Sequence, residues 1–213
     1  MAKDLHDERR EDELISQICA GKKDLFQALI GPYQRSVFSV AYSMVNNAAD
    51  AEEIAQEVFL KAFRALATFR AEAKFRTWLI QITLNEARMR LRRKHPHLYQ
   101  SQDETPTSEV CDYVPRDLAD WREIPSETLA RKELRWTIER TIRQLPPMYR
   151  EVLVLRDLQY LNTTETSQVL GISEDLVKTR LRRARLQMRE ALAPGYDGSW
   201  TVESKEYKSV RPW

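Results

Sequence analysis

Apolar residues recur at helical spacing through the N-terminal half of the chain. A first stripe has steps of three and four, which predicts one helical face despite the intervening Pro32. Its members are Phe26, Leu29, Tyr33, Val37, Val40 and Met44. A second stripe follows Asp50, which has capping-box spacing with Glu53. It consists of Ile54, Val58, Ala62 and Leu66. A third helix begins at Phe75 and runs into an arginine cluster. Three helices with short connections can share one core.

The C-terminal part opens with two helical segments separated by prolines. Ser126 is the predicted N-cap of the first segment. Its apolar stripe is Leu134, Ile138, Ile142 and Leu145. Pro146 and Pro147 end this segment. The residues from Tyr149 to Leu158 then form the next helix, since a helix accepts proline in its first turn.

A short helix, a glycine turn and a long helix follow. Asn162 and Glu165 have capping-box spacing at the start of the short helix. Gly171 suits a left-handed C-cap, and Ser173 can cap the final helix. When the second helix of such a pair is rich in Lys and Arg, this order is the outline of a helix-turn-helix unit.

The final helix has an apolar stripe and a basic outer face. The apolar stripe is Val177, Leu181, Ala184 and Met188. The basic face is made by Lys178, Arg182 and Arg185, with Thr179 and Arg183 beside them. A helix inserted in a major groove needs this arrangement, although a solvated surface helix also shows it. Glu174 and Asp175 in the first turn would repel phosphates, so base contacts are expected from Lys178 onward.

Composition and charge indicate the fold class and the domain organisation. Only 5 of 213 residues are glycine and 31% are charged, which favours an all-α fold over turn-rich β-structure. The 34 basic and 32 acidic residues are segregated along the chain. Residues 101–127 contain eight acids and two arginines, together with three prolines. This segment is therefore predicted to be an acidic flexible linker between two small helical domains.

Several function classes find no support. No stretch is long and apolar enough for a bilayer span, and the first residues lack a signal-peptide core. We therefore expect a cytoplasmic protein without membrane insertion. Cys19 and Cys111 have no metal-ligand spacing, and no catalytic constellation is present. Neither a metal nor a cofactor is expected, and the chain is not predicted to be an enzyme.

Aromatic and basic residues alternate before the third helix and within it. Phe69, Phe75 and Trp78 are interleaved with Arg70, Lys74 and Arg76. Five cations follow within seven residues, namely Arg88, Arg90, Arg92, Arg93 and Lys94. Single-stranded DNA is bound by aromatic stacking combined with phosphate contacts, which this pattern offers. The alternatives are a core role for Phe75 and Trp78 and a solvated helix end for the cations.

The second helix carries a candidate protein interface. Its acids come early and its cations late, and Gln56 and Phe59 lie off the apolar stripe. An exposed aromatic among charges can mark a protein contact, although a single one is weak support.

Four blocks of this sequence resemble the bacterial RNA polymerase sigma factors of the extracytoplasmic-function (ECF, group IV) family. The blocks are DAEEIAQEVFLKAFRAL from Asp50, FRAEAKFRTWLIQITLNEARMRLRRK from Phe69, LPPMYREVLVLRDL from Leu145 and LGISEDLVKTRLRRARLQMRE from Leu170. The resemblance implies a sigma region 2 helical bundle at 24–95 and a sigma region 4 helix-turn-helix at 127–192. An extension (1–23), the linker (96–126) and a tail (193–213) complete the chain.

The resemblance also implies a function and a set of sites. The expected function is promoter-specific transcription initiation, with region 2 melting the minus-ten element and region 4 reading the minus-thirty-five element. The implied polymerase contacts are Asp50, Glu53, Gln56, Phe59 and Arg64. The implied minus-ten contacts are Phe69, Arg70, Phe75, Trp78, Asn85, Arg88 and Arg92. The implied minus-thirty-five contacts are Lys178, Thr179, Arg182 and Arg183. Implied partners are the β′ clamp helices and β flap of core RNA polymerase, promoter DNA and an anti-sigma factor.

Some positions depart from that family pattern. Met89 stands where many members have Asp, Thr166 and Ser167 replace Ile and Ala, and Tyr160 replaces a common Gly. Ser and Thr at semi-buried positions are expected either to loosen the helix or to form local hydrogen bonds. An alternative function is a helix-turn-helix regulator that binds palindromic duplex DNA without polymerase. That hypothesis gives the aromatic and basic block no purpose, and a helical scaffold would leave both basic stretches unexplained.

Overall fold

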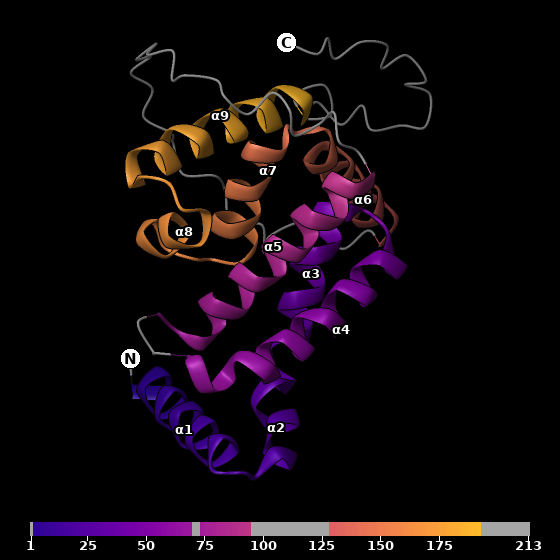
Figure 1. Cartoon of the computed structure of the whole chain (residues 1–213). Helices are drawn as coiled ribbons and strands as arrows, with labels where there is room; N and C mark the ends of the chain where they lie inside the picture. The colour runs from indigo at the N-terminus through magenta and orange to yellow at the C-terminus, as the bar shows by residue number, and fades with distance from the viewer. Residues whose placement is uncertain (1, 70–72, 95–127, 193–213) are drawn as a thin grey trace.

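The computed structural model describes residues 2–69, 73–94 and 128–192, and its regular elements there are all helical (Figure 1). The first group is α1 (Ala2–Cys19), η1 (Lys23–Leu25), α2 (Phe26–Ile30), η2 (Gly31–Tyr33), α3 (Gln34–Val45), α4 (Ala48–Ala65), η3 (Leu66–Thr68) and α5 (Phe75–Lys94). The second group is α6 (Thr128–Gln144), α7 (Pro147–Leu153), η6 (Val154–Leu158), α8 (Thr163–Leu170) and α9 (Glu174–Leu192). The predicted all-α fold is confirmed. The predicted linker and tail lie outside the described residues.

In the first module, which we define as 24–95, α3, α4 and α5 pack against one another. The predicted first helix is divided, because Gly31 and Pro32 lie in the 3-10 turn η2 between α2 and α3. The predicted cap of α4 is wrong by three residues. Asn47 is the N-cap, and its side chain accepts a 3.0 Å hydrogen bond from the Asp50 backbone N–H. The Asp50 carboxylate is thereby left free for contacts with α5.

Helix α1 occupies most of the N-terminal extension, a segment for which the apolar pattern gave no prediction. Its C-terminal part packs on the first module, where Ile18 is buried and Leu14 and Ile15 lie against the core. Tyr33 donates a hydrogen bond to Glu11 of this helix. Figure 1 shows α1 and α2 at the opposite end of the molecule from α9. Among the described residues, no helix combines the length and apolarity needed to span a bilayer.

The second module, defined as 127–192, confirms most of the predicted helix boundaries. Asn162 and Glu165 form a reciprocal capping box at the start of α8, and Gly171 ends that helix with φ of 67°. Ser173 accepts a 3.3 Å hydrogen bond from the Leu176 N–H at the start of α9. Pro147 begins α7. The predicted cap Ser126 lies outside the described residues.

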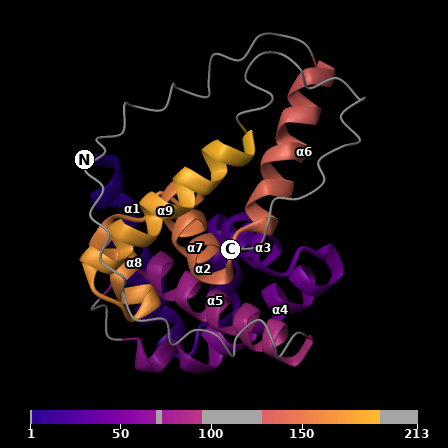
Figure 2. The same cartoon turned by 90° about the horizontal axis from the view of Figure 1, so that it is seen from above.

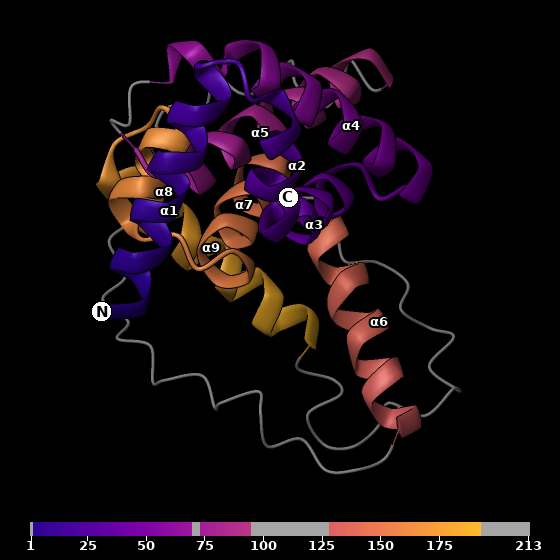
Figure 3. The ribbon, with the colours of Figure 1, turned by 90° about the horizontal axis from the view of Figure 1, so that it is seen from below.

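The two modules pack directly against each other. Helix α3 contacts α6, α7 and η6, while α5 contacts α8, and buried residues of both modules belong to one apolar cluster. Helix α6 projects from this body (Figure 2 and Figure 3). Because α5 is covered by α3 and α4 as well as by α8, it buries residues around much of its circumference. It lacks the single apolar stripe of a surface helix for that reason.

The turn between η6 and α8 contains a strained residue. Tyr160 has φ of 55°, in the left-handed region, and its side chain is 83% exposed. A side chain with a Cβ is disfavoured there, whereas glycine is not. The left-handed backbone conformation explains why glycine is common at this position in the family pattern.

We predict that Tyr160→Gly raises the free energy of unfolding by about 0.5–1 kcal/mol, because it relieves the left-handed strain and sacrifices little buried surface. Urea denaturation measures the change. Tyr160→Ala is the matched control, since it removes the ring but keeps the Cβ, and should change stability by less than about 0.5 kcal/mol. Equal stabilities of the Gly and Ala variants would contradict the argument.

Candidate nucleic-acid and polymerase interfaces

Helix α9 presents an open polar row above a buried apolar stripe. Val177 and Ala184 are fully buried. Three predicted duplex contacts are exposed on the outer face, namely Lys178, Thr179 and Arg182. The fourth, Arg183, is half-buried and lies 3.5 Å from the Tyr149 hydroxyl of α7. The predicted amphipathic character of the helix is confirmed.

A charged pair fastens α9 to the helix beneath it. The Arg185 guanidinium donates to both carboxylate oxygens of Asp157 in the π-helical turn η6, at 2.6 and 3.0 Å. This hydrogen bonding raises the pKa of Arg185. Although the sequence placed Arg185 on the basic face, its side chain therefore joins two elements of the second module. At the exposed start of α9, a 3.0 Å hydrogen bond to Asp175 raises the pKa of Lys178.

The polar residues in α8 form local hydrogen bonds. The fully buried Thr166 donates its hydroxyl to the Asn162 carbonyl at 2.8 Å, and Ser167 donates to the Thr164 carbonyl at 2.8 Å. The second of the two predicted outcomes is thus confirmed, and these departures leave the helix intact.

An aromatic cluster surrounds the start of α5. The Phe69 and Trp78 ring centroids lie 5.1 Å apart, and each lies 5.7 Å from that of Phe75. The Phe75 ring also contacts Tyr33 edge to face. Phe75 is buried, whereas Phe69 and Trp78 are half-buried. Phe75 accordingly supports the other rings and offers no open face in this conformation.

The predicted polar contacts on α5 fall into two groups. Asn85 and Arg92 are exposed, whereas Arg88 is half-buried and donates to both oxygens of Glu151 in α7. Arg70 lies outside the described residues. Sequence reasoning missed the Arg88 pairing because Glu151 is 63 positions away along the chain.

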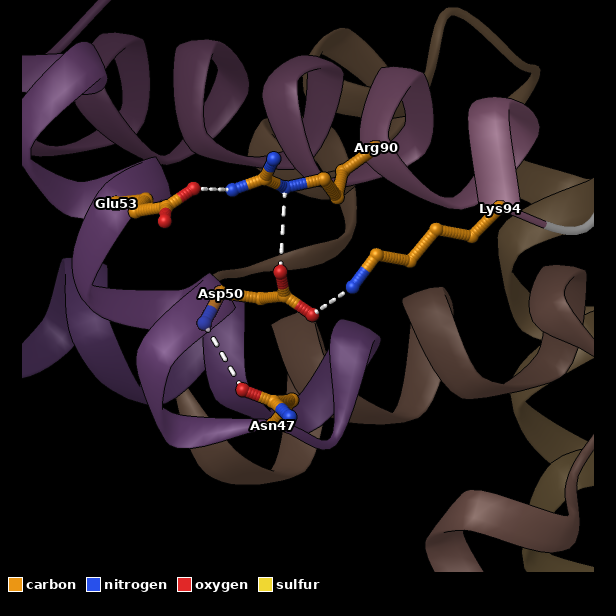
Figure 4. A network of polar contacts seen from close by, with 5 residues as sticks. All are labelled: Asn47, Asp50, Glu53, Arg90 and Lys94. Carbon is orange, nitrogen blue, oxygen red and sulfur yellow. Dashed lines mark hydrogen bonds and ion pairs between the residues drawn. The ribbon is translucent and has the colours of Figure 1, made fainter.

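A charged network joins the start of α4 to the end of α5 (Figure 4). Lys94 Nζ lies 2.5 Å from one Asp50 oxygen, and Arg90 Nε lies 3.5 Å from the other. Arg90 also pairs with Glu53. Hydrogen bonding from Lys94 is the main cause that holds the pKa of Asp50 below its ordinary value. Two predicted polymerase contacts, Asp50 and Glu53, therefore also hold α4 against α5.

The outer face of α4 differs from the prediction at one position. Gln56 and Arg64 are exposed, as expected, but Phe59 is half-buried and packs against the core, so its predicted outward orientation is wrong. The reason is that the core extends farther around α4 than the predicted stripe. Leu60, which is 51% exposed, is the apolar residue beside Gln56. It lines a groove between α4 and α5 together with the exposed Met89.

Comparison with known families identifies both modules. The family Sigma-70 region 2 matches residues 29–96, and the family Sigma-70, region 4 matches residues 135–188. The chain is 33% identical over 178 residues to the ECF RNA polymerase sigma factor SigW of Bacillus subtilis, covering 84% of this chain and 94% of that protein. It is 32% identical over 191 residues to the RNA polymerase sigma-H factor of Pseudomonas aeruginosa, covering 88% and 96%.

Solved structures share the fold. One is a structure of CnrH in complex with the cytosolic domain of CnrY, with TM-score 0.61 and 24% identity over 85% of this chain and 96% of that one. Another is the sigma factor RpoE in complex with the anti-sigma factor NepR from Bartonella quintana, with TM-score 0.59 and 18% identity over 79% and 96%. The two modules are thus those of a sigma-70-type initiation factor. The chain belongs to the ECF family of RNA polymerase sigma factors, and its function is that of a sigma factor in promoter-directed transcription.

The network at Asp50 predicts a pH-dependent contribution to stability. Because the folded-state pKa of Asp50 is lowered from its ordinary value of 3.8, the contribution is present above that value and fades as the pH falls through the lowered pKa. Asp50→Asn should therefore lower the Tm near neutral pH, and the difference from the unmodified chain should shrink toward zero in acid. Thermal unfolding across a pH series measures this.

Glu52→Gln is the control, since Glu52 is an exposed carboxylate in the same turn of α4. It should lower the Tm less than Asp50→Asn does near neutral pH. A difference for Asp50→Asn that stays constant into acid would show that its effect comes from packing and not from charge.

Proposed function

We propose that α9 reads the minus-thirty-five element as duplex DNA, through Lys178, Thr179, Arg182 and Arg183. The observation that carries this assignment is the exposed polar row above the buried stripe of Val177, Leu181 and Ala184. A helix that follows a tight turn and shows such a face can enter the major groove, where Arg and Lys contact guanine edges.

We further propose that α5 and the segment before it capture the separated strand of the minus-ten element. Exposed Asn85 and Arg92 supply polar contacts, and Arg88 supplies a phosphate contact. Phe69, Arg70 and Trp78 form the stacking and phosphate-binding part. Phe75 takes a supporting role, because it is buried beneath Phe69 and Trp78.

The polymerase-binding surface is assigned to α4. Asp50, Glu53, Gln56 and Arg64 remain proposed contacts with the β′ clamp helices, and we add Leu60 because it is the exposed apolar residue of that face. Phe59 contributes by packing beneath this surface. Region 4 is assigned to 127–192 with the β flap as its partner, and region 2 to 24–95. The extension, linker and tail keep the bounds 1–23, 96–126 and 193–213.

The partners follow from the same assignment. An anti-sigma factor is a proposed partner, supported by the RpoE structure, which is described as a complex with the anti-sigma factor NepR. In this proposal the chain supplies specificity and bond formation belongs to the polymerase, so the chain itself is not an enzyme. A protein that acts with RNA polymerase on DNA works in the cytoplasm.

Run-off transcription with bacterial core RNA polymerase on a promoter pool tests the proposal. The chain should direct initiation from a small set of promoters that share two elements, and it should bind duplex DNA poorly by itself. Tight dimeric binding to a palindromic site with no effect on core polymerase would support the alternative regulator. The matches to both sigma regions do not favour that alternative.

Substitutions at exposed and at packed positions of α4 should have different effects on polymerase affinity and on folding stability. Leu60→Ala and Gln56→Ala should weaken affinity for core polymerase while leaving the Tm nearly unchanged, because both side chains are exposed. A central interface anchor costs about 2 kcal/mol of binding energy on truncation. Phe59→Ala should instead lower the free energy of unfolding by roughly 2 kcal/mol, since it removes packed apolar surface.

Binding to labelled core polymerase and urea denaturation measure the two effects. Arg10→Ala is a control at an exposed position in α1, and should change neither quantity. A large loss of stability in Leu60→Ala with unchanged polymerase affinity would reverse the roles of Leu60 and Phe59.

Substitutions in α9 and in α5 should respond differently when the duplex promoter is replaced by a premelted template. Arg182→Ala should relax preference at one upstream base pair by ~1–3 kcal/mol. Asn85→Ala should impair promoter opening, and a premelted bubble should rescue much of its loss because the bases are already unpaired. Run-off yield and permanganate reactivity on duplex and bubble templates measure both effects.

Matched controls come from the same classes of side chain. Arg189→Ala lies in the last turn of α9 and Gln27→Ala is an exposed amide in α2, so neither should change template preference. Equal rescue of Arg182→Ala and Asn85→Ala by the bubble would contradict the division of tasks between α9 and α5.

A further inference from the structure

A buried carboxylate of region 4 lies against the proposed strand-binding helix of region 2. Glu151 in α7 is only 3% exposed. Its Oε1 accepts from Arg88 Nε at 2.8 Å, and its Oε2 accepts from Arg88 Nη2 at 2.6 Å. This parallel two-bond geometry is also the one by which arginine binds a phosphate. A carboxylate buried to this degree needs such a partner, because an unpaired buried charge is strongly unfavourable.

Further contacts join α5 to region 4 at the other end of the helix. Arg76, also in α5, donates to the Gln159 carbonyl oxygen at 2.6 Å and lies 3.3 Å from its Oε1. Together with the α5 contact to α8, these bonds join α5 to region 4 at a second place along the helix.

A second set of contacts lies at the end of α3. Arg150 of α7 donates to the Met44 carbonyl at 3.1 Å, where a cation complements the helix dipole. The Arg143 guanidinium lies 5.8 Å from the centroid of the Tyr42 ring. The Arg88–Glu151 pair is therefore one part of an extended interface between the regions.

We infer that Glu151 occupies on Arg88 the place that a phosphate of the separated strand takes, so that region 4 and single-stranded DNA compete for one guanidinium. This inference rests on the proposed role of Arg88. Glu151 occupies the Nε–Nη2 edge of the guanidinium, so a phosphate has to displace the carboxylate to bind that edge. Strand binding and closure of the modules therefore oppose each other, and the opposition is reciprocal by thermodynamic linkage.

The full-length chain and a short fluorescein-labelled oligothymidine test the competition by fluorescence anisotropy. Glu151→Gln keeps the shape of the side chain and removes its charge. It should raise affinity for the oligothymidine roughly fivefold or more, because a larger fraction of the chain becomes competent to bind. Asp157→Asn is the matched control, since it makes the same change in net charge at a carboxylate that pairs with Arg185 inside region 4. It should gain less than about twofold.

Adding Arg88→Ala to Glu151→Gln identifies the site of the gain. The double variant should fall back to the affinity of Arg88→Ala alone, whereas an undiminished gain would overturn the competition at Arg88. No gain in folded Glu151→Gln would overturn it as well. Glu151→Met, an apolar side chain of similar length, provides the same test if Glu151→Gln fails to fold.

Run-off transcription with core polymerase separates this inference from the proposed function. If Arg88→Ala initiates and opens promoters as well as the unmodified chain does, the proposed role of Arg88 fails, and the competition fails with it. If Arg88→Ala opens promoters poorly but Glu151→Gln shows no gain in oligothymidine binding, the proposed function stands and only the competition is overturned.

Discussion

The arrangement of the two modules depends on one electrostatic requirement: a carboxylate buried at their boundary must be paired. Glu151 lies in α7, and the residues that follow it, Val152 to Leu155 in α7 and η6, are buried in the core. Arg88 of α5 reaches Glu151 from the first module at 2.6 Å and stabilises its charge. Breaking the pair would leave the less exposed partner, Glu151, without compensation. The Arg88–Glu151 pair thereby couples the packing of region 4 on α5 to the charge state of this boundary.

Helix α5 consequently makes contacts on more than one side. One side packs into the three-helix core with α3 and α4, another contacts α8, and its last turns carry exposed cations. Lys94 and Arg90 hold α4 through Asp50, while Arg88 reaches region 4. The arginine cluster thus contains structural ion pairs beside the residues that are proposed to contact DNA. Charge density along the sequence alone does not distinguish these tasks, since each depends on which carboxylate the fold brings near.

Helix caps could be predicted from the sequence, whereas ion pairs between distant residues could not. The capping box at Asn162, the left-handed Gly171 and the cap Ser173 each act within a few residues, and all were predicted. The cap of α4 was missed because Asn47 and Asp50 both suit the role, and tertiary contacts with α5 decide between them. The predicted outward orientation of Phe59 was wrong for a similar reason, since the spacing of apolar residues does not show how far around a helix the core extends. The contact of Arg88 with Glu151 spans two modules and has no local signal.

If region 4 and the separated strand compete for Arg88, the free chain should be closed at this boundary, and the modules should separate when polymerase and promoter DNA are bound. Spin labels on Gln27→Cys in α2 and Leu186→Cys in α9, with Cys19 and Cys111 replaced by Ser, report the separation of regions 2 and 4. Pulsed electron paramagnetic resonance should find one narrow distance distribution in the free chain and a different distribution once core RNA polymerase and promoter DNA are bound. A free chain that already shows the distribution of the bound state would contradict this expectation.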